Sequence, residues 1–93
     1  MVPIKAANIA RKLSDVFELP KEIVLNLPLI TLVGNEDLTI ENYKGVLEYS
    51  EEKIRINTTA GVIRVEGRKL ALKRISRESV SISGVIIKLE YFV

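Results

Sequence analysis

Apolar side chains recur at every second position along most of the chain, in short runs separated by turn-forming residues. This period of two is typical of strands with one buried face. From Ile30 through Leu38 and Val46 to Ile54 the runs keep a spacing of eight residues. The positions that mark the expected strands are Ile30 and Leu32, Leu38 and Ile40, Val46, Ile54 and Ile56, Ile63 and Val65, Leu70 and Leu72, Val80 and Ile82, and Ile87 and Leu89.

Turn signals fall between these runs. They are Gly34-Asn35, the stretch from Asn42 to Gly45, Ala60-Gly61, Gly67 and Ser83-Gly84. Short strands with a turn every 8–10 residues leave no room for crossover helices, and they favour an antiparallel fold. The sequence therefore predicts a mainly β protein, a small antiparallel β-sandwich or rolled barrel. A β-solenoid is the alternative, although no residue-level repeat recurs.

The N-terminal residues follow a different pattern. Apolar residues between Ile4 and Phe17 have helical spacing, and Pro20 ends the pattern. We expect a short amphipathic helix in residues 1–18 and an all-β domain in residues 19–93. The helix either packs on the β domain or docks on a partner or membrane surface. The run from Glu22 to Leu27 alternates as well, and Pro28 limits it to a sheet edge or a bend.

The last run, from Val85 to Val93, is apolar on both faces. Such a strand is either central in its sheet or an edge that awaits a partner chain. Aromatic residues are enriched at protein interfaces. Tyr91 and Phe92 are therefore candidate interface residues, and Phe92→Asp is expected to leave the fold intact and to abolish association.

Composition removes most catalytic chemistry. The chain has no His and no Cys, which excludes the usual zinc ligands and every Ser-His or Cys-His nucleophile. The paired carboxylates at Glu36-Asp37 and Glu51-Glu52 lack the spacing of a calcium loop, and solvated turns explain them. We expect no enzyme activity and no cofactor. No apolar run is long enough to span a membrane, and no signal-peptide core is present, so the sequence predicts a cytoplasmic protein.

Charge is unevenly distributed. Residues 1–52 carry five basic and nine acidic side chains, whereas residues 53–93 carry nine basic and three acidic ones. The second half contains a basic cluster made of Arg68, Lys69, Lys73, Arg74 and Arg77. A solvated hairpin is one interpretation of this cluster, and an acidic protein or lipid surface is another. Binding of nucleic acid would call for interleaved aromatics or a much higher net charge than +2.

Two stretches carry a family resemblance. Residues 19–35 read LPKEIVLNLPLITLVGN, and residues 40–50 read IENYKGVLEYS. With GVIRVEG at 61–67 and GVI at 84–86, they resemble the YabP/YqfC family of sporulation proteins, and the LPK opening is nearer to the YqfC branch. Leu29 stands where the family has a basic residue, and Tyr43 where it often has His. These are strand and turn motifs, and they mark no reactive centre.

The resemblance implies a small, all-β, non-enzymatic protein made in the mother cell of endospore-forming bacteria. It implies action beside a YqfD-like membrane protein, at the mother-cell side of the forespore membrane. Family likeness also adds Tyr43, in the turn at residues 42–45, to the candidate interface. Two hypotheses remain open at this stage. One is an interaction module that forms discrete oligomers or binds the membrane partner, and the other is a structural protein of the spore envelope that assembles without limit.

Overall fold

A computed structural model describes residues 26–93, and this part of the chain contains six strands and no helix. Their bounds are β1 Leu29–Val33, β2 Asp37–Glu41, β3 Tyr43–Tyr49, β4 Lys53–Thr58, β5 Gly61–Ile75 and β6 Ser79–Phe92. All neighbours are antiparallel, in the order β1-β2-β6-β5-β4-β3. The prediction of a mainly β antiparallel fold is confirmed, and the solenoid alternative is wrong. The predicted helix at 1–18 lies outside the described residues, as does most of the run at 22–27.

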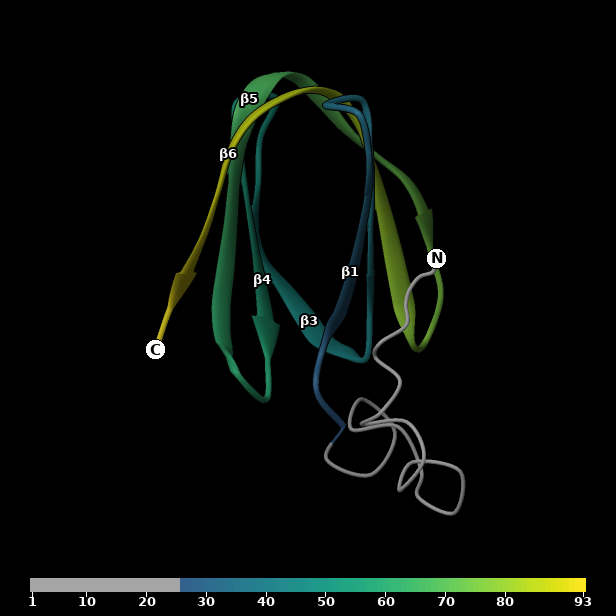
Figure 1. The fold of residues 1–93 in the computed structure, drawn as a ribbon, viewed down its shortest axis with the longest axis vertical. Coiled ribbons are helices and arrows are strands. Elements are labelled where there is room, and N and C mark those ends of the chain that lie inside the picture. Colours follow the sequence, from purple (N-terminus) through teal and green to yellow (C-terminus); the bar gives the residue numbers. More distant parts are fainter. Residues whose placement is uncertain (1–25) are drawn as a thin grey trace, which may run out of the picture.

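The single sheet folds back over itself into two layers. In Figure 1, β5 and β6 arch over the top, and the other strands hang in two arms below them. The first layer contains β1, β2, the start of β6 and the end of β5, whereas the second contains β3, β4, the start of β5 and the end of β6. The protein is therefore a sandwich built from one continuous sheet.

The core lies between the two layers and consists of aliphatic residues. β2 and the start of β6 contribute from one side, and β4 and the start of β5 from the other. The buried apolar residues are Leu38, Ile40, Ile54, Ile56, Ile63, Val65, Leu70, Val80, Ile82 and Ile86. All but Ile86 belong to the alternating positions that the sequence marked as strands. The period-two pattern therefore predicted the core almost residue by residue.

The two long strands differ from the prediction. Gly67 and Ser83-Gly84 were expected to separate strands, but they lie inside β5 and β6, where the sheet bends. A Cβ atom at Gly67 would lie 1.9 Å from the Val85 carbonyl oxygen. At Gly84, with φ +132°, it would lie 2.6 Å from that of Lys69. These glycines let two backbones approach closely at a β-bulge, which is another common use of glycine in strands.

Hairpin turns cover both bends. The Gly67 and Leu70 amides of β5 donate to the carbonyls of Glu52 and Glu51, in the turn between β3 and β4. In the same way, the Gly84 and Ile86 amides of β6 donate to carbonyls of the β1–β2 turn, at Glu36 and Asn35. The amides that the bends release from the ladder thus find partners, as buried backbone groups require.

A single residue, Asn42, carries the chain from one layer to the other. It has φ 66°, a left-handed conformation that Asn tolerates better than most residues. Its amide donates to the Glu78 carbonyl at 2.7 Å, and its side-chain amide donates to the Leu27 carbonyl at 2.9 Å. The predicted turn at 42–45 is therefore too long. Gly45 lies inside β3, where the register shifts at a bulge.

Candidate interaction surface

The end of β6 is an open sheet edge. β2 pairs with β6 only from Ser79 to Ser83, whereas β5 accompanies β6 as far as Phe92. We call residues 85–92 the edge segment, because only β5 pairs with them in the described chain. The sequence left two alternatives for this run, a central strand or an edge. The structure contains both in one strand, since the start of β6 is central and its end is an edge.

The edge segment exposes large apolar side chains. Ile87 is 61% exposed, Tyr91 45% and Phe92 47%. Tyr91 faces the inner side of the second layer, opposite Ile63, whereas Phe92 lies on the outer side opposite Val62. The Arg64 guanidinium sits 4.6 Å from the centre of the Phe92 ring. Two candidate interface residues, Tyr91 and Phe92, are thus exposed on neighbouring positions of one open strand. Their role in association stays a prediction.

The third candidate, Tyr43, makes contacts within the chain. Its ring packs against the core, and its hydroxyl donates to the Ser76 carbonyl at 2.7 Å. Ser76 belongs to the turn between β5 and β6, so this bond ties β3 in the second layer to the first layer. Tyr43 lies on a different strand from Tyr91 and Phe92, at the opposite side of the second layer. Its proposed interface role stays untested.

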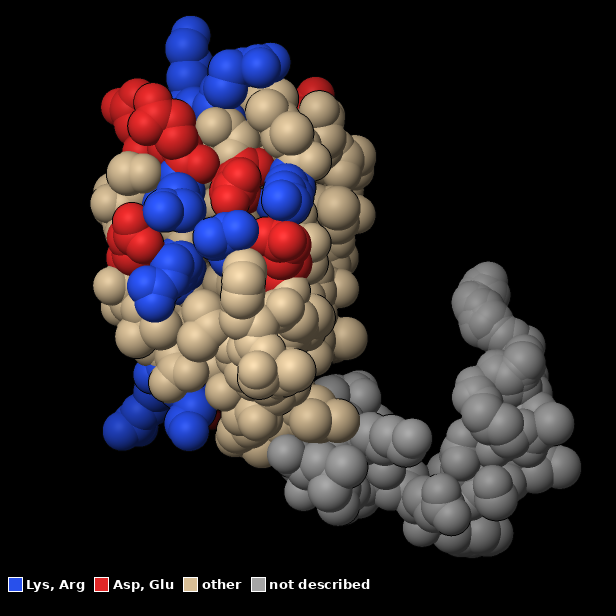
Figure 2. Space-filling model, turned by 90° about the vertical axis from the view of Figure 1, so that its left-hand side faces the viewer, with Lys and Arg blue, Asp and Glu red and all other residues tan. Residues whose placement is uncertain are grey.

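Two groups of ion pairs lie on the outer face of the second layer, and we call them together the ion-pair network. Glu48 of β3 lies 3.7 Å from both Lys53 and Arg55 of β4. Arg64 of β5 lies 2.9 Å from Glu66 and 2.8 Å from Glu90 of β6. Figure 2 shows this side of the molecule, with basic and acidic side chains interleaved above an uncharged region. Ion pairs at or near a protein surface add little stability, so the network defines a charge pattern more than it holds the fold.

Glu90 has the clearest electrostatic perturbation in the network. The hydrogen bond from Arg64 lowers the pKa of its carboxyl group below the ordinary value, and nearby Lys88 acts in the same direction. Partial desolvation opposes this shift. The ion pair from Arg64 to Glu66 is less well directed, because the Nε–H does not point at the carboxylate as a hydrogen bond requires. Arg64 therefore anchors chiefly to the edge segment.

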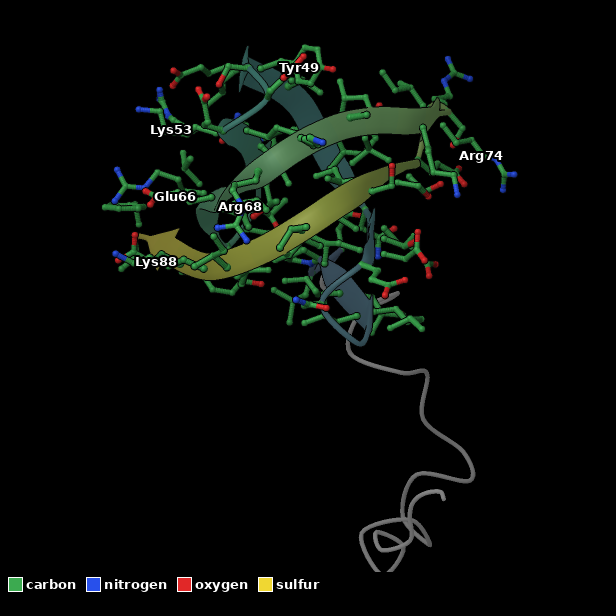
Figure 3. The ribbon with its side chains drawn as sticks, turned by 90° about the horizontal axis from the view of Figure 1, so that it is seen from above. Tyr49, Lys53, Glu66, Arg68, Arg74 and Lys88 are labelled. Carbon is green, nitrogen blue, oxygen red and sulfur yellow. The ribbon has the colours of Figure 1, made fainter. Side chains whose placement is uncertain are left out.

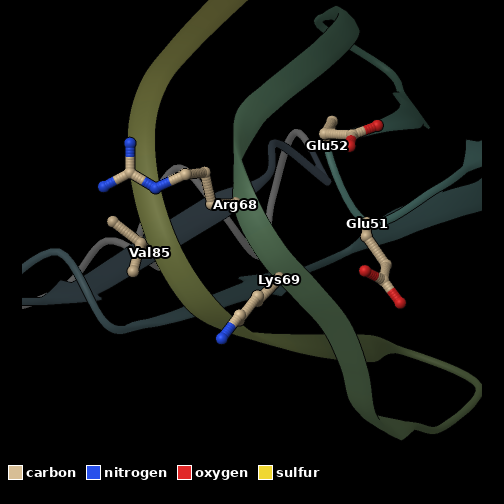
Figure 4. Close-up of a pocket in the computed structure, with 5 residues that line it drawn as sticks. All are labelled: Glu51, Glu52, Arg68, Lys69 and Val85. Atoms are coloured by element: carbon tan, nitrogen blue, oxygen red, sulfur yellow. The ribbon is translucent and has the colours of Figure 1, made fainter.

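The predicted basic cluster does not form one patch. Arg68 and Arg74 lie at well-separated places in Figure 3, because β5 bends between them. Lys73 lies 3.8 Å from Asp37 of β2, and Arg77 belongs to the exposed tip between β5 and β6. Arg68 and Lys69 line a depression of about 350 Å³ at the bend, together with Glu51, Glu52 and Val85. In Figure 4 the two cationic groups point away from the two carboxylates.

Binding chemistry for metals is not apparent in the part of the chain that the structure describes. No group of three or more His, Cys, Asp or Glu side chains converges among residues 26–93. Glu36 and Glu51-Glu52 lie in exposed turns, and Asp37 begins β2. Within the same residues, no helix has the length and apolarity needed to cross a membrane.

The sequence-based predictions missed the ion-pair network, although a signal was present. Charged residues alternate at Lys53 and Arg55, at Arg64 and Glu66, and at Lys88 and Glu90. Such spacing places each pair on one face of its strand. Which strands lie side by side decides whether these charges meet, and that order became clear only with the structure.

The fold and its surface define a class: a small domain made of one folded antiparallel sheet, with an open apolar strand edge. A model of the YabP family matches residues 26–92. The chain belongs to this family, which confirms the resemblance seen in the sequence. The uncharacterized protein YqfC of Bacillus subtilis (strain 168) is 32% identical over 79 residues, which cover 85% of this chain and 85% of that relative.

Proposed function

We propose that this chain is a non-enzymatic assembly module of endospore formation, which binds a YqfD-like membrane protein at the mother-cell side of the forespore membrane. The open edge segment with its exposed apolar side chains is the observation that carries the assembly role. Unpaired strand edges are templates for pairing with another chain, and exposed aromatics beside them are typical anchors. Membership of the YabP family supplies the link to sporulation, and the lack of His and Cys supports the non-enzymatic role.

Phe92 is the natural position at which to test this function. Its side chain is half exposed on the outer face, so an aspartate there leaves the core intact and places a charge on the proposed surface. Leu47 of β3 provides a matched control, because it is 49% exposed and lies at the other side of the second layer. Leu47→Asp therefore makes the same chemical change away from the edge segment.

The experiment is flotation of the full chain with liposomes that contain the YqfD-like membrane protein from the same genome. The wild type and Leu47→Asp are expected to float with these liposomes. For Phe92→Asp the bound fraction is expected to fall at least about tenfold, which is the effect of removing a hot-spot side chain. Empty liposomes of the same lipids should retain little of any form. Equal flotation of the wild type with loaded and empty liposomes would contradict the proposal.

A second candidate function is a self-assembling structural protein of the spore envelope. The observation that favours it is that β1 and β3 also end the sheet without a neighbour among the described strands. Contacts between different edges would generate open-ended filaments, whereas pairing of one edge with itself closes a dimer. Sedimentation over a range of concentrations separates these outcomes, since filaments grow with concentration and a dimer does not.

A further inference from the structure

Among the described residues the sandwich has four open strand edges, and they differ in how well they are protected from pairing. β3 contains two register shifts, and the end of β5 contains two more together with exposed Lys73 and Arg74. Bulges and charged side chains, above all lysines, are the usual protection of an edge. β1 has regular register and no charged side chain. The edge segment is regular from Lys88 to Phe92 and carries one charge of each sign.

Two-fold symmetry limits how the edge segment can pair with a copy of itself. The two-fold axis is perpendicular to the sheet. Two residues that face each other across it must have their side chains on the same face of the sheet, so their residue numbers differ by an even number. An axis at Lys88 would set this residue against its own copy, and an axis at Glu90 would set two carboxylates together. Like charges directly opposite one another destabilise an antiparallel pair.

An axis at Leu89 gives the opposite result. Lys88 then faces Glu90 of the second copy, and Glu90 faces Lys88, so both charges gain a partner across the interface. The exposed Ile87, which lies at the bulge beside Gly67, comes opposite Tyr91 of the second copy. A β-branched residue beside an aromatic one is a favourable pair. An axis at Ile87 would set Lys88 opposite Ile86 and Glu90 opposite Gly84, and an axis at Tyr91 would set Glu90 opposite Phe92, so neither gives these charges an opposite partner. Leu89 is therefore the one centre at which the charge pattern complements itself.

We propose that the edge segment binds a second copy of this chain, antiparallel, about a two-fold axis at Leu89. The second layers of the two copies then form one continuous sheet. The ion pairs that Arg64 makes with Glu66 and Glu90 then continue over the axis to Lys88 of the second copy. The apolar side chains of Ile87 and Tyr91 become covered. This inference rests on the assembly role in the proposed function: the backbone of the edge segment pairs with a second copy, and Phe92 on the outer face of the joined sheet is left for the membrane partner.

Charge reversal tests the register directly. Lys88→Glu alone brings glutamates 88 and 90 of the two copies face to face, and Glu90→Lys alone brings lysines together. Each variant is expected to weaken association at least about tenfold, as close like charges in strands and interfaces do. A mixture of the two variants restores both opposite-charge pairs, so mixing them is expected to recover a dimer. Light scattering measures the molar mass of the full chain in solution, which is compared with the 10.4 kDa of the monomer.

Several outcomes would overturn the proposal. A wild-type monomer at high concentration is one, and undiminished association of either single variant is another. Failure of the mixture to associate, when both variants give the wild-type circular dichroism spectrum, is a third. Glu90→Lys also places a lysine beside Arg64, and the repulsion between the two cations is expected to destabilise the fold of that variant. A second measurement is therefore needed that leaves both charges in place.

Cysteine crosslinking provides that measurement, because the chain has no cysteine of its own. Leu89→Cys places the two thiols on the axis, with Cβ atoms about 4.5–5.5 Å apart as in any directly facing pair. Mild oxidation or a short bifunctional thiol reagent is expected to trap a covalent dimer. Leu47→Cys on β3 and Leu32→Cys on β1 are the matched controls on the other edges, and neither is expected to crosslink. Efficient crosslinking of a control, or none at residue 89, would overturn the register.

Failure of this dimer is distinguishable from failure of the proposed function. A monomeric wild type that still floats with the YqfD-like protein would refute the two-fold pairing and leave the membrane assembly role in place. A crosslinked Leu89→Cys dimer that floats no better with loaded than with empty liposomes would support the two-fold pairing and refute the membrane assembly role.

Discussion

The two parts of β6 share one strand and have opposite surroundings. From Ser79 to Ser83 the strand lies between β2 and β5, and its inward residues Val80 and Ile82 are completely buried. From Val85 to Phe92 it has β5 on one side and no strand on the other among the described residues. The outward side chains change as well, from serines in the first part to Lys88, Glu90 and Phe92 in the second.

The difference shows how one bend divides a strand into a part packed in the core and a part exposed at the margin of the sheet. Before Gly84 the strand has two neighbours, so its side chains are fixed by core packing. Beyond it the strand enters the second layer at the margin, where apolar groups remain exposed and charges lie on the outer face. The bend is therefore the feature on which both parts of the strand depend, and disturbing it is expected to have the largest effect.

Gly67→Ala is expected to destabilise the fold most. The added methyl group would lie 1.9 Å from the Val85 carbonyl oxygen, at the point where β6 passes from one part to the other. Because backbone atoms cannot move aside easily, we expect a loss of more than about 3 kcal/mol in unfolding free energy. Urea denaturation provides the measurement. Gly45→Ala in β3 is the control, since its methyl group would meet no atom within 4 Å. Equal stability of the two variants would refute the steric role of Gly67.

The two isoleucines of β6 give a direct comparison of its parts. Ile82 is completely buried and Ile87 is 61% exposed. Ile82→Ala is expected to lower the unfolding free energy by about 3 kcal/mol, because it leaves a cavity in the core. Ile87→Ala should cost less than about 1 kcal/mol. Denaturation curves of both variants at one pH measure the difference. Similar losses at the two sites would mean that the edge segment is packed as tightly as the core.

The alternating pattern of the sequence was sufficient for the core but not for the connections. Ile54, Ile56, Ile63 and Val65 are inward because strands alternate, and this follows from the sequence alone. Gly67 and Gly84 are ambiguous, since glycine serves a turn and a bulge equally well. Only the backbone that approaches each glycine distinguishes the two uses, and that backbone is remote in the sequence.

The candidate interaction surface was predictable only in part. Tyr91 and Phe92 stood out as aromatics in a strand that is apolar on both faces, and the structure places them at an open edge. The basic cluster was grouped by sequence proximity, and the bend in β5 separates its members. Glu48, Arg55, Arg64 and Glu90 belong to different strands, so their association depends on strand order, which local sequence does not encode.

The smallest expected effect concerns Glu90 and pH. Because Arg64, helped by Lys88, lowers the pKa of this carboxyl in the folded protein, the ionised group stabilises the fold above the ordinary glutamate value of about 4.3. That contribution is lost as the pH falls through the lower, folded-state pKa. Glu90→Gln is therefore expected to be less stable than the wild type at pH 7, and the gap should narrow at about pH 3.

Urea denaturation of both proteins at the two pH values measures this gap, and replacing Arg64 by Gln in each provides the control. With Arg64 gone, the chief cause of the lowered pKa is removed, so the gap at pH 7 should shrink. The segment from Ser79 to Gly84 has no ionisable side chain, so any pH dependence arising within β6 comes from its second part. A gap that stays constant between the two pH values would show that the charge of Glu90 does not stabilise the edge segment.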